Sequence, residues 1–359
     1  MKLSNALLAT ACVAGCANTS GSTSAVCAAP SRATATPAAA WTGTVFTIVM
    51  ENKSRHDILG NRKAPFINQL AREGAVAVGY HGPYVHPSEP NYLWMTGGQN
   101  FGVLDDEDPI KHPISSTTHI ADQLELAGLS WKSYQESMGE PCGLVSHGRY
   151  AAKHDPFVYY SDINGWDGKT FKPSARCNEH VVDLTQLDTD IATNKVPRYV
   201  FITPNLDDDM HDGSIARGDQ WLSQLVPKIM ATDAYKHNGV IFLLWDEGSG
   251  TLAPGDDPPF IVVSPLANVG ATSKTEYDTS SYLKTVQNIL GLEEVSCDPK
   301  HTKALAMTDM FVSPLKNDES YAASAIGAPG SSSMSVRSGS SLQSSSVSGS
   351  LATSATPGR

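Results

Sequence analysis

The sequence predicts an α/β fold with a mostly parallel central sheet and helices on both of its faces. Two long apolar runs, 44–50 and 239–245, show no polar alternation, which is typical of strands buried on both faces of a parallel sheet. Segments with helical spacing separate the strand-like runs. This alternation of strand and helix favours a sheet that is covered by helices on both sides.

The first elements surround a turn that opens a helix. A strand is expected over 44–50, and a helix follows over about 64–73, where apolar residues recur at helical spacing before a glycine. A short strand over 75–80 leads to the turn. Pro90 suits the first turn of a helix, so we expect a helix from this residue to a Gly-Gly pair.

The later part of the chain continues the alternation. The expected elements in chain order are a helix over 120–128, strands over 130–134 and 198–203, a helix over about 215–230, strands over 239–245 and 260–263, and a helix over 280–292. No internal repeat is visible, and no linker interrupts residues 44–315. We therefore expect these elements to form one domain.

The charge balance is acidic, with 37 Asp and Glu residues against 26 Lys and Arg residues. A nucleic-acid-binding protein would carry a basic surface, so the composition argues against a nucleic-acid partner. It does not exclude a phosphate substrate, because a bound cation reverses the local field. The general expectation is a soluble exported protein.

The N-terminal residues 1–16 are expected to be a signal peptide, with Lys2 followed by an apolar stretch too short to span a bilayer. Cys16 follows Val-Ala-Gly, as in a bacterial lipobox, and its lipidation would tether the protein to a membrane. Ordinary cleavage nearby is the alternative. Residues 17–40 predict a flexible tether and residues 319–359 a disordered Ser/Gly-rich tail, so the protein would be secreted or held at the cell envelope.

Cysteine usage agrees with export. Three cysteines fall in the leader and tether, and Cys142, Cys177 and Cys297 belong to the domain. No spacing resembles a zinc site, so a disulfide is the better interpretation. Cys142 and Cys177 bracket the segment around His154 and are the favoured pair. Cys297 would then pair with a tether cysteine or remain a buried thiol.

Polar residues follow both long buried strands, Glu51 and Asn52 after the first and Asp246 and Glu247 after the second. Open parallel sheets place their chemistry beyond the carboxyl ends of the strands, so these residues should converge on one edge together with Ser88. Such oxygen ligands suit one divalent metal ion, Ca, Mg, Mn or Zn, that can hold a phosphate. The alternative for each pair is a solvated acid at a strand end.

Ser88 lies just before Pro90, at an expected helix N-terminus. Backbone N–H groups and the helix dipole favour an anion there. Coordination to a divalent cation would lower the pKa of the hydroxyl and supply a nucleophile. The alternative is an ordinary N-cap serine.

Five short motifs occur in one order between residues 44 and 315. They are Met50-Glu51-Asn52-Lys53-Ser54, Ser88-Glu89-Pro90-Asn91-Tyr92, Lys153-His154-Asp155-Pro156-Phe157, the stretch 203–212 with sequence TPNLDDDMHD, and Trp245-Asp246-Glu247-Gly248. In these motifs the chain resembles the phosphoesterase family of the alkaline-phosphatase superfamily, which includes secreted acid phosphatases and bacterial phospholipases C. The resemblance implies an alkaline-phosphatase-like fold, with residues 41–318 as the catalytic domain.

The resemblance also implies roles for individual residues. Five side chains would hold the metal, namely Glu51, Asn52, Ser88, Asp246 and Glu247. Ser88 would be transiently phosphorylated, as in related members of the superfamily.

His154 and His211 are the candidates for holding the phosphate and protonating the leaving oxygen, because imidazole titrates near working pH. Neighbouring acids, Asp155 for the first and Asp209 or Asp212 for the second, would orient the rings and raise their pKa values. Acid phosphatases of the family often carry a His-His pair where this chain has His154-Asp155, which leaves the equivalence of the second position open.

Asn91, Lys153 and His86 are expected to contact the substrate. The acidic run 207–209 is expected to be a solvated loop, with a second metal site as the alternative. The predicted function is an exported metal-dependent phosphomonoesterase of acid-phosphatase type that acts on small phosphate monoesters. One alternative is a phospholipase C-type phosphodiesterase, but the larger phospholipases of the family carry C-terminal domains that the short polar tail after residue 315 cannot form. The other alternative is a non-catalytic surface-binding protein, and the intact set of site residues argues against it.

Overall fold

The computed structural model describes residues 41–82, 85–250, 257–293, 298–313 and 315. All of them belong to the first of two units of the chain, residues 1–318. The expected signal peptide with Cys16, the tether, the tail and Cys297 lie outside the described residues and stay predictions. None of the helices in the described part has the length and apolar character needed to cross a membrane.

An eight-stranded sheet with the order β4-β3-β5-β1-β6-β7-β2-β8 forms the centre of the fold. The strands are β1 Val45–Met50, β2 Ala75–Ala77, β3 Trp131–Gln135, β4 Val181–Asp183, β5 Tyr199–Thr203, β6 Val240–Trp245, β7 Phe260–Val263 and β8 Thr272–Ser273. Only β7 runs antiparallel to its neighbours among the paired strands of the described residues. The predicted α/β class with a mostly parallel sheet is confirmed.

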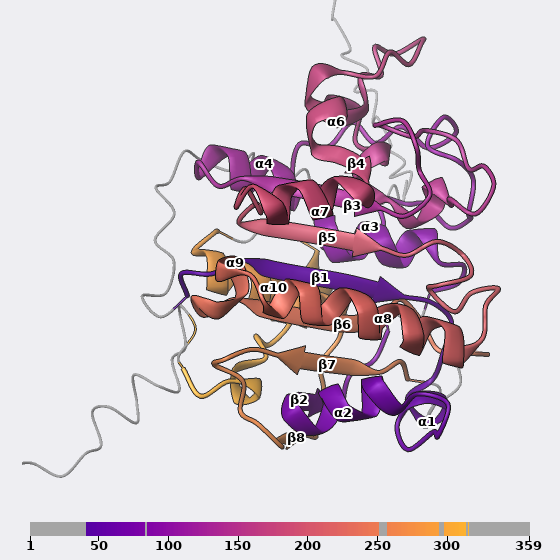
Figure 1. Cartoon of the computed structure of the whole chain (residues 1–359). Coiled ribbons are helices and arrows are strands. Elements are labelled where there is room, and N and C mark those ends of the chain that lie inside the picture. The colour runs from indigo at the N-terminus through magenta and orange to yellow at the C-terminus, as the bar shows by residue number, and fades with distance from the viewer. Residues whose placement is uncertain (1–40, 83–84, 251–256, 294–297, 314, 316–359) are drawn as a thin grey trace, which may run out of the picture. The chain divides into compact units, whose positions relative to one another are not determined.

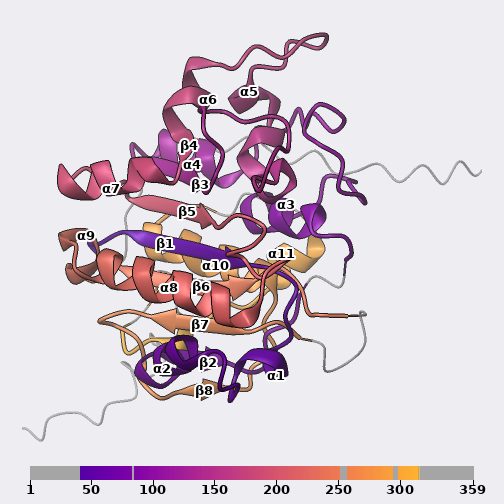
Figure 2. The same ribbon diagram turned by 45° about the vertical axis from the view of Figure 1, so that its right-hand side comes forward.

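Helices cover both faces of this sheet. The helices are α1 Arg55–Ile58, α2 Pro65–Glu73, α3 Glu89–Gly97, α4 Ile120–Leu126, α5 Ser161–Asn164, α6 Ala175–His180, α7 Thr185–Ala192, α8 Ile215–Met230, α9 Asp233–Lys236, α10 Thr279–Leu290 and α11 Pro299–Lys303, with 3₁₀ turns η1 Ala152–His154, η2 Pro156–Tyr159 and η3 Thr308–Met310. Helix α8 crosses in front of β1 and β6, whereas α10 lies behind them (Figures 1 and 2).

The alternating side chains of β1 explain why its sequence is apolar throughout. Val45 and Val49 belong to the core that includes residues of α3, α4 and α10. Phe46 and Ile48 point the other way, into the core that includes residues of α2 and α8. Both faces of the strand are therefore removed from water, as expected for a central strand of a covered sheet.

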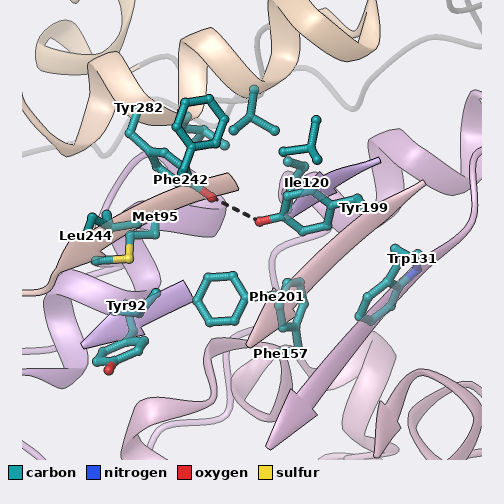
Figure 3. Packing of buried hydrophobic residues seen from close by; sticks show 14 of the residues in the cluster. Tyr92, Met95, Ile120, Trp131, Phe157, Tyr199, Phe201, Phe242, Leu244 and Tyr282 are labelled. Carbon is teal, nitrogen blue, oxygen red and sulfur yellow. Dashed lines mark hydrogen bonds between the residues drawn. The ribbon is translucent and has the colours of Figure 1, made fainter. Parts of the chain in front are cut away.

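An aromatic row supports the edge of the sheet near Ser88. The Phe201 ring of β5 lies 6.4 Å from the Tyr92 ring of α3 and 5.6 Å from the Phe157 ring of η2, both in edge-to-face geometry. The Trp131 ring of β3 continues the row, 4.8 Å from Phe157 (Figure 3). Such contacts are favourable beyond simple burial and fix the rings relative to one another.

The long predicted elements are present, with boundaries that differ by a few residues. The expected strand over 75–80 is shorter, because only Ala75–Ala77 pair with neighbours. The structure adds the short strands β4 and β8 and the helices α1, α5, α6, α7, α9 and α11, which the sequence did not predict. Strands of two or three residues are too short for a periodic pattern to reveal them.

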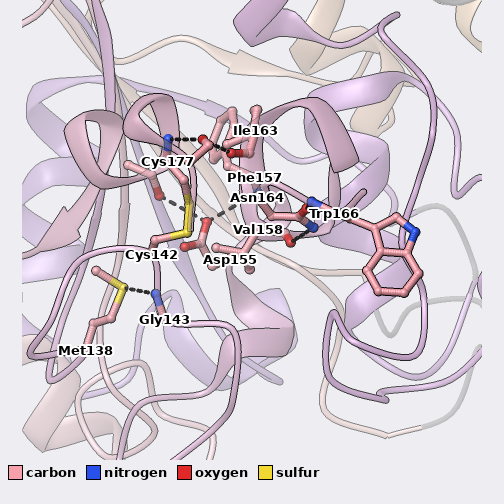
Figure 4. The surroundings of a disulfide bond; sticks show 12 residues. Met138, Cys142, Gly143, Asp155, Phe157, Val158, Ile163, Asn164, Trp166 and Cys177 are labelled. Carbon is pink, nitrogen blue, oxygen red and sulfur yellow. Dashed lines mark hydrogen bonds between the residues drawn. A yellow bond between two sulfur atoms is a disulfide. The ribbon is translucent and has the colours of Figure 1, made fainter. Parts of the chain in front are cut away.

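The predicted disulfide between Cys142 and Cys177 is confirmed. It joins the loop after β3 to helix α6, with a Cα–Cα distance of 5.3 Å. Figure 4 shows the bond beside Asp155 and Phe157, the residues that follow His154. The bridge thus closes the segment that carries one of the candidate site residues.

Candidate active site

The carboxyl ends of β1 and β6 bring two acidic residues to one edge of the sheet. These strands pair in parallel register, with Met50 opposite Trp245, so Glu51 and Asp246 follow at equivalent positions. The backbone N–H of Asp246 donates to the carbonyl of Met50 over 3.1 Å. Both acidic side chains are fully buried.

Asn52 ties these two carboxylates together. Its backbone has a φ of 52°, in the left-handed region that asparagine tolerates better than most residues. In this conformation the backbone N–H donates to Asp246 Oδ1 over 3.2 Å, and the side-chain amide donates to Glu51 Oε2 over 2.8 Å. A single residue therefore holds both acids in fixed relative positions.

Ser88 lies at the start of α3 without acting as its side-chain cap. Its φ and ψ are −64° and −42°, which are helical values, and its hydroxyl makes no capping hydrogen bond. The Oγ atom instead donates to Glu51 Oε2 over 3.2 Å, and the residue is only 2% exposed. The N-cap alternative does not describe this serine, because its hydroxyl faces the acidic edge.

Glu247 is held by two of the expected substrate-binding residues. Asn91 Nδ2 donates to Glu247 Oε2 over 3.1 Å, and His86 Nδ1 pairs with the same oxygen. His86 precedes a cis peptide bond to Pro87. Asn91 and His86 therefore lie at the edge of the sheet, beside one of the predicted metal ligands.

Lys153 is partly buried and pairs with Asp106, whose Oδ2 accepts from its Nζ over 2.5 Å. The other oxygen of Asp106 accepts the backbone N–H of Glu89 over 3.0 Å, directly after Ser88. Burial lowers the pKa of Lys153, but Asp106 together with Glu51 and Asp246 raises it by more, so the amine stays charged. The positively charged amine of Lys153 is thus held near the acidic edge of the sheet.

His154 is fully enclosed between two carboxylates that come from different elements. Its Nε2 lies 3.2 Å from Glu51 Oε1, and its Nδ1 lies 3.5 Å from Asp209 Oδ2. Burial, with Lys153 and His211 nearby, holds the pKa of His154 well below its usual range.

The prediction that Asp155 orients His154 and raises its pKa is wrong. Asp155 points away and accepts from Ser133 Oγ over 3.2 Å and from the backbone N–H of Phe157 over 3.3 Å. Loss of hydration is the main cause for His154, because burial disfavours the charged imidazolium, and the nearby Lys153 and His211 act in the same direction.

His211 is more open. Its Nδ1 lies 2.8 Å from Asp212 Oδ1, as the sequence suggested, and its side chain is 29% exposed. The ring lies 5.8 Å from the ring of His154, and its backbone N–H donates to Asp209 Oδ1 over 2.7 Å. Asp209 therefore connects the two histidines.

The remaining acids of the run 207–209 have arginine partners. Asp207 pairs with Arg149 at 2.8 Å and with Arg217 at 3.0 Å, and Asp208 pairs with Arg217 at 2.8 Å. These pairs explain the acidic run without a second metal at Asp207 and Asp208. A close turn shapes this loop, because a Cβ on Gly213 would lie 1.8 Å from the carbonyl oxygen of Asp207.

Four carboxyl groups crowd the edge, and burial disfavours their charged forms. Burial and the nearby acids raise the pKa values of Glu51 and Asp209 well above their usual range. Burial raises the pKa of Asp246 to about 6, and burial with Asp246 raises that of Glu247 to about 9. Uncompensated acids at such proximity fit a divalent cation, which offsets their mutual repulsion.

The donor atoms also fit a cation. Asp246 Oδ2 is buried and makes no hydrogen bond within the described part of the chain. Glu51, His154 and His211 each offer one ligand atom within 4.8 Å of the others, whereas Asp246 and Glu247 belong to no such group among the described residues. The oxygen-rich set of Glu51, Asn52, Ser88, Asp246 and Glu247 suits a hard cation such as calcium, magnesium or manganese.

Tyr92 was not predicted as a site residue, and Asp209 was predicted only as a possible partner of His211. Tyr92 donates its hydroxyl to Glu51 Oε1 over 2.7 Å, and Asp209 faces His154. Tyr92 follows Ser88 by four residues, a spacing that places both on the same side of a helix and could have identified it. The contact of Asp209 with His154 had no signal in the sequence, because 55 positions separate the two residues.

Comparison with known proteins agrees with the motifs. The profile of the phosphoesterase family matches residues 38–293. A phosphatidylinositol-3-phosphatase of Mycobacterium tuberculosis is 30% identical over 74% of this chain and 82% of its own length. Acid phosphatases of Penicillium chrysogenum and Aspergillus fumigatus are 27% and 28% identical over 63% and 56% of this chain. The chain spans about half the length of these fungal relatives, 54% and 44%.

Solved structures agree on the fold alone. The crystal structure of Ps i-CgsB superposes with a TM-score of 0.50 at 12% identity, covering 74% of this chain and 75% of that one. A protein of Bacteroides thetaiotaomicron from a locus for glycosaminoglycan metabolism also reaches 0.50, at 14% identity over 75% and 76% of the two chains. Both belong to a fold with the same kind of covered central sheet.

Proposed function

Because the chain belongs to the phosphoesterase family, we propose that it is an exported, metal-dependent phosphomonoesterase of acid-phosphatase type, with Ser88 as its nucleophile. The family and the relatives named acid phosphatase make it a hydrolase of phosphate esters. The observation that carries the finer proposal is the Ser88 hydroxyl, 3.2 Å from Glu51 within a group of buried acids.

Glu51, Asn52, Ser88, Asp246 and Glu247 would hold one divalent ion. When bound, this ion would lower the pKa of the serine hydroxyl and offset the charge of the phosphate. It would be calcium, magnesium, manganese or zinc. The raised carboxyl pKa values support this assignment, because burial and the neighbouring acids disfavour the charged forms and a cation would offset both effects.

The reaction would proceed in two displacements. Ser88 Oγ would lose its proton and form a bond to phosphorus while the bond from phosphorus to the alcohol oxygen breaks, and the departing oxygen would take a proton from His211. Water then attacks the phosphoserine, which releases inorganic phosphate and restores the serine. Lys153 and Asn91 lie near enough to the acidic edge to orient the phosphoryl oxygens.

His211 is better suited than His154 to protonate the leaving oxygen. It is partly exposed and pairs with Asp212, so it can exchange protons with solvent. His154 is enclosed, and burial lowers its pKa. It would therefore act as a neutral imidazole that holds Glu51 and Asp209 in place. This division of labour refines the joint role expected from the sequence.

Export and a monoester substrate complete the proposal. The Cys142–Cys177 disulfide supports an oxidising compartment, in line with the predicted signal peptide and the possible lipidation of Cys16. The relatives described above are named as phosphatases, including one for phosphatidylinositol 3-phosphate, which supports a phosphate monoester as substrate. A phospholipase C-type activity on diesters is the competing outcome.

The test compares p-nitrophenyl phosphate, bis-p-nitrophenyl phosphate and phosphatidylcholine, with each of the four cations added to metal-stripped protein. We expect the monoester to be hydrolysed fastest, and Ser88→Ala to lose activity by at least about 10³-fold with an unchanged melting temperature. Ser264→Ala is the matched control, since Ser264 is buried and donates to Gly239 away from the site. Acid quenching of the parent should trap phosphate on the peptide that contains Ser88.

Three results would contradict the proposal. Faster cleavage of the diester or of phosphatidylcholine would favour a phospholipase C-type enzyme. Ser88→Ala activity within tenfold of the parent would remove Ser88 from the nucleophile role. No hydrolysis of any ester with any cation would favour the non-catalytic alternative.

A further inference from the structure

Tyr92 contacts both the carboxylate of Glu51 and the imidazole of His154 in the candidate site. Its side chain is fully buried, and its hydroxyl donates to Glu51 Oε1 over 2.7 Å. The other oxygen of this carboxylate, Oε2, accepts from Ser88 Oγ over 3.2 Å and from the Asn52 amide over 2.8 Å. The two oxygens of Glu51 therefore have separate sets of partners.

We infer that Tyr92 is a positioning residue that fixes the Glu51 carboxylate so that Oε2 stays directed at Ser88 and at the proposed cation. A carboxylate on a flexible side chain can exchange its two oxygens by rotation. The tyrosine hydroxyl opposes this rotation because it holds Oε1 while Ser88 and Asn52 bond to Oε2. This inference rests on the proposed metal-dependent function.

The chemistry of the donor supports the role. A buried carboxylate needs hydrogen-bond donors, since an unsatisfied oxygen away from water is costly. Lysine or arginine at this position would also donate to the oxygen, but its positive charge would offset the charge of the Glu51 carboxylate. The affinity of the site for a metal cation would then fall. A tyrosine hydroxyl donates without adding charge, so Glu51 keeps its full attraction for a divalent ion. Partners of this kind orient metal ligands in many proteins.

Tyr92 also fixes the imidazole of His154. The two rings are stacked, with centroids 5.1 Å apart and planes 12° apart. His154 Nε2 lies 3.2 Å from the same Glu51 oxygen that Tyr92 holds. The stacked ring restricts rotation of the imidazole, so one side chain sets the geometry of both a proposed ligand and its histidine neighbour.

The tyrosine is itself rigid. Its ring packs edge-to-face against Phe201, which in turn contacts Phe157 of the segment after His154 (Figure 3). Tyr92 lies on α3, four residues after Ser88. The proposed nucleophile and the tyrosine that holds Glu51 therefore belong to the same helix. A displacement of Tyr92 would therefore be transmitted to Glu51 and His154 together.

The test measures cation affinity directly. Manganese alone and calcium alone are titrated by calorimetry into metal-stripped parent, Tyr92→Phe and Tyr160→Phe proteins. Tyr160→Phe is the matched control, because Tyr160 is also fully buried and its hydroxyl bonds to Thr96 of the same helix, away from Glu51. We expect Tyr92→Phe to weaken cation binding by about 10–100-fold and Tyr160→Phe to leave it within twofold of the parent.

Activity provides a second measurement. Since Tyr92 acts through Glu51, saturating cation should restore most of kcat in Tyr92→Phe, while the cation concentration for half-maximal activity rises as the affinity falls. Unchanged cation affinity in Tyr92→Phe, or an equal loss in Tyr160→Phe, would overturn the assignment.

Glu51→Gln separates the two proposals. If it abolishes cation binding while Tyr92→Phe leaves the affinity unchanged, the positioning role fails and the metal site stands. If the parent itself binds no cation, the proposed metal site fails and the role of Tyr92 fails with it.

Discussion

At the scale of single residues, burial decides the charge of the acids around the site. The acidic side chains that follow β1 and β6 are not salt-bridged surface groups but enclosed carboxyls whose pKa values lie above the ordinary range. Asp155 is also a buried carboxyl with a raised pKa, although it takes no part in the proposed chemistry. Burial raises its pKa to about 7, and its two hydrogen bonds only partly offset this effect.

Asp155 should make the protein less stable as the pH rises. The native state keeps the proton up to about pH 7, whereas the unfolded chain releases it near 4. The native state therefore binds more protons in this interval, and the free energy of unfolding falls by up to about 1.4 kcal/mol per pH unit. Asp155→Asn should remove this contribution and gain stability relative to the parent between pH 4 and 7.

Urea unfolding at several pH values checks this expectation. Asp188→Asn is the control, because Asp188 is exposed and pairs with Lys228 on the surface. If Asp155→Asn kept the parent's pH slope, the buried carboxyl would be ionised in the native state and the argument would fail.

At the scale of elements, the long crossing from β3 to β5 carries His154 in a segment with little regular structure. This stretch contains η1, η2 and several short helices, and it is closed by the Cys142–Cys177 bridge (Figure 4). Short helices of this kind contribute little stability by themselves, because helix nucleation is unfavourable. The covalent closure compensates by limiting the unfolded ensemble.

Removal of the bridge should destabilise the protein and loosen the His154 segment. The sequence separation of 35 residues corresponds to roughly 4 kcal/mol in the chain-entropy description. The double variant Cys142→Ser with Cys177→Ser should therefore unfold at lower denaturant, with faster amide exchange over residues 143–176. Peptide mapping without reduction first establishes the bond, and free thiols at both positions in the exported protein would refute it.

At the scale of the whole molecule, the sheet gathers negative charge at one edge of a chain that is already acidic, with a formal net charge of −11. The strands β1 and β6 lie side by side at the centre of the sheet, so their terminal acids cannot separate without breaking it. The fold thus keeps carboxyl groups close together whose ionisation is unfavourable without a counterion.

Divalent cations should therefore stabilise the folded protein. A ligand that binds only the native state at a hundred times its Kd adds about 2.7 kcal/mol, which corresponds to a rise in Tm of roughly 5 °C. Thermal melting of metal-stripped protein with each cation measures the shift. It should be smaller at pH 5 than at pH 7.5, because protons compete for Asp246, whose pKa is about 6.

Asp246→Asn provides the comparison for this experiment. It should melt at a similar or higher temperature than the metal-stripped parent, since one repulsive charge is gone, but it should gain little on addition of the cation. An equal gain in parent and variant would show that the cation binds elsewhere on the acidic surface.

The sequence by itself determined the class of fold and one half of the site. The period of the side chains along a strand is local, so the apolar runs of β1 and β6 revealed two strands buried on both faces. The parallel arrangement then required the polar residues after them to meet at one edge, and the motifs placed Ser88 beside them. These inferences needed only neighbouring positions in the chain and a general rule of sheet geometry.

Only the tertiary structure decided the strand order and the partners of the histidines. His154 meets Glu51 and Asp209, which are 103 and 55 positions away in the sequence, and not the adjacent Asp155. The pKa values of these groups depend on loss of hydration, which several distant segments produce together. No local pattern contains this information, and the contacts of Tyr92 with Glu51 and of Asp209 with His154 therefore became recognisable only when the sheet and its helices brought these residues together.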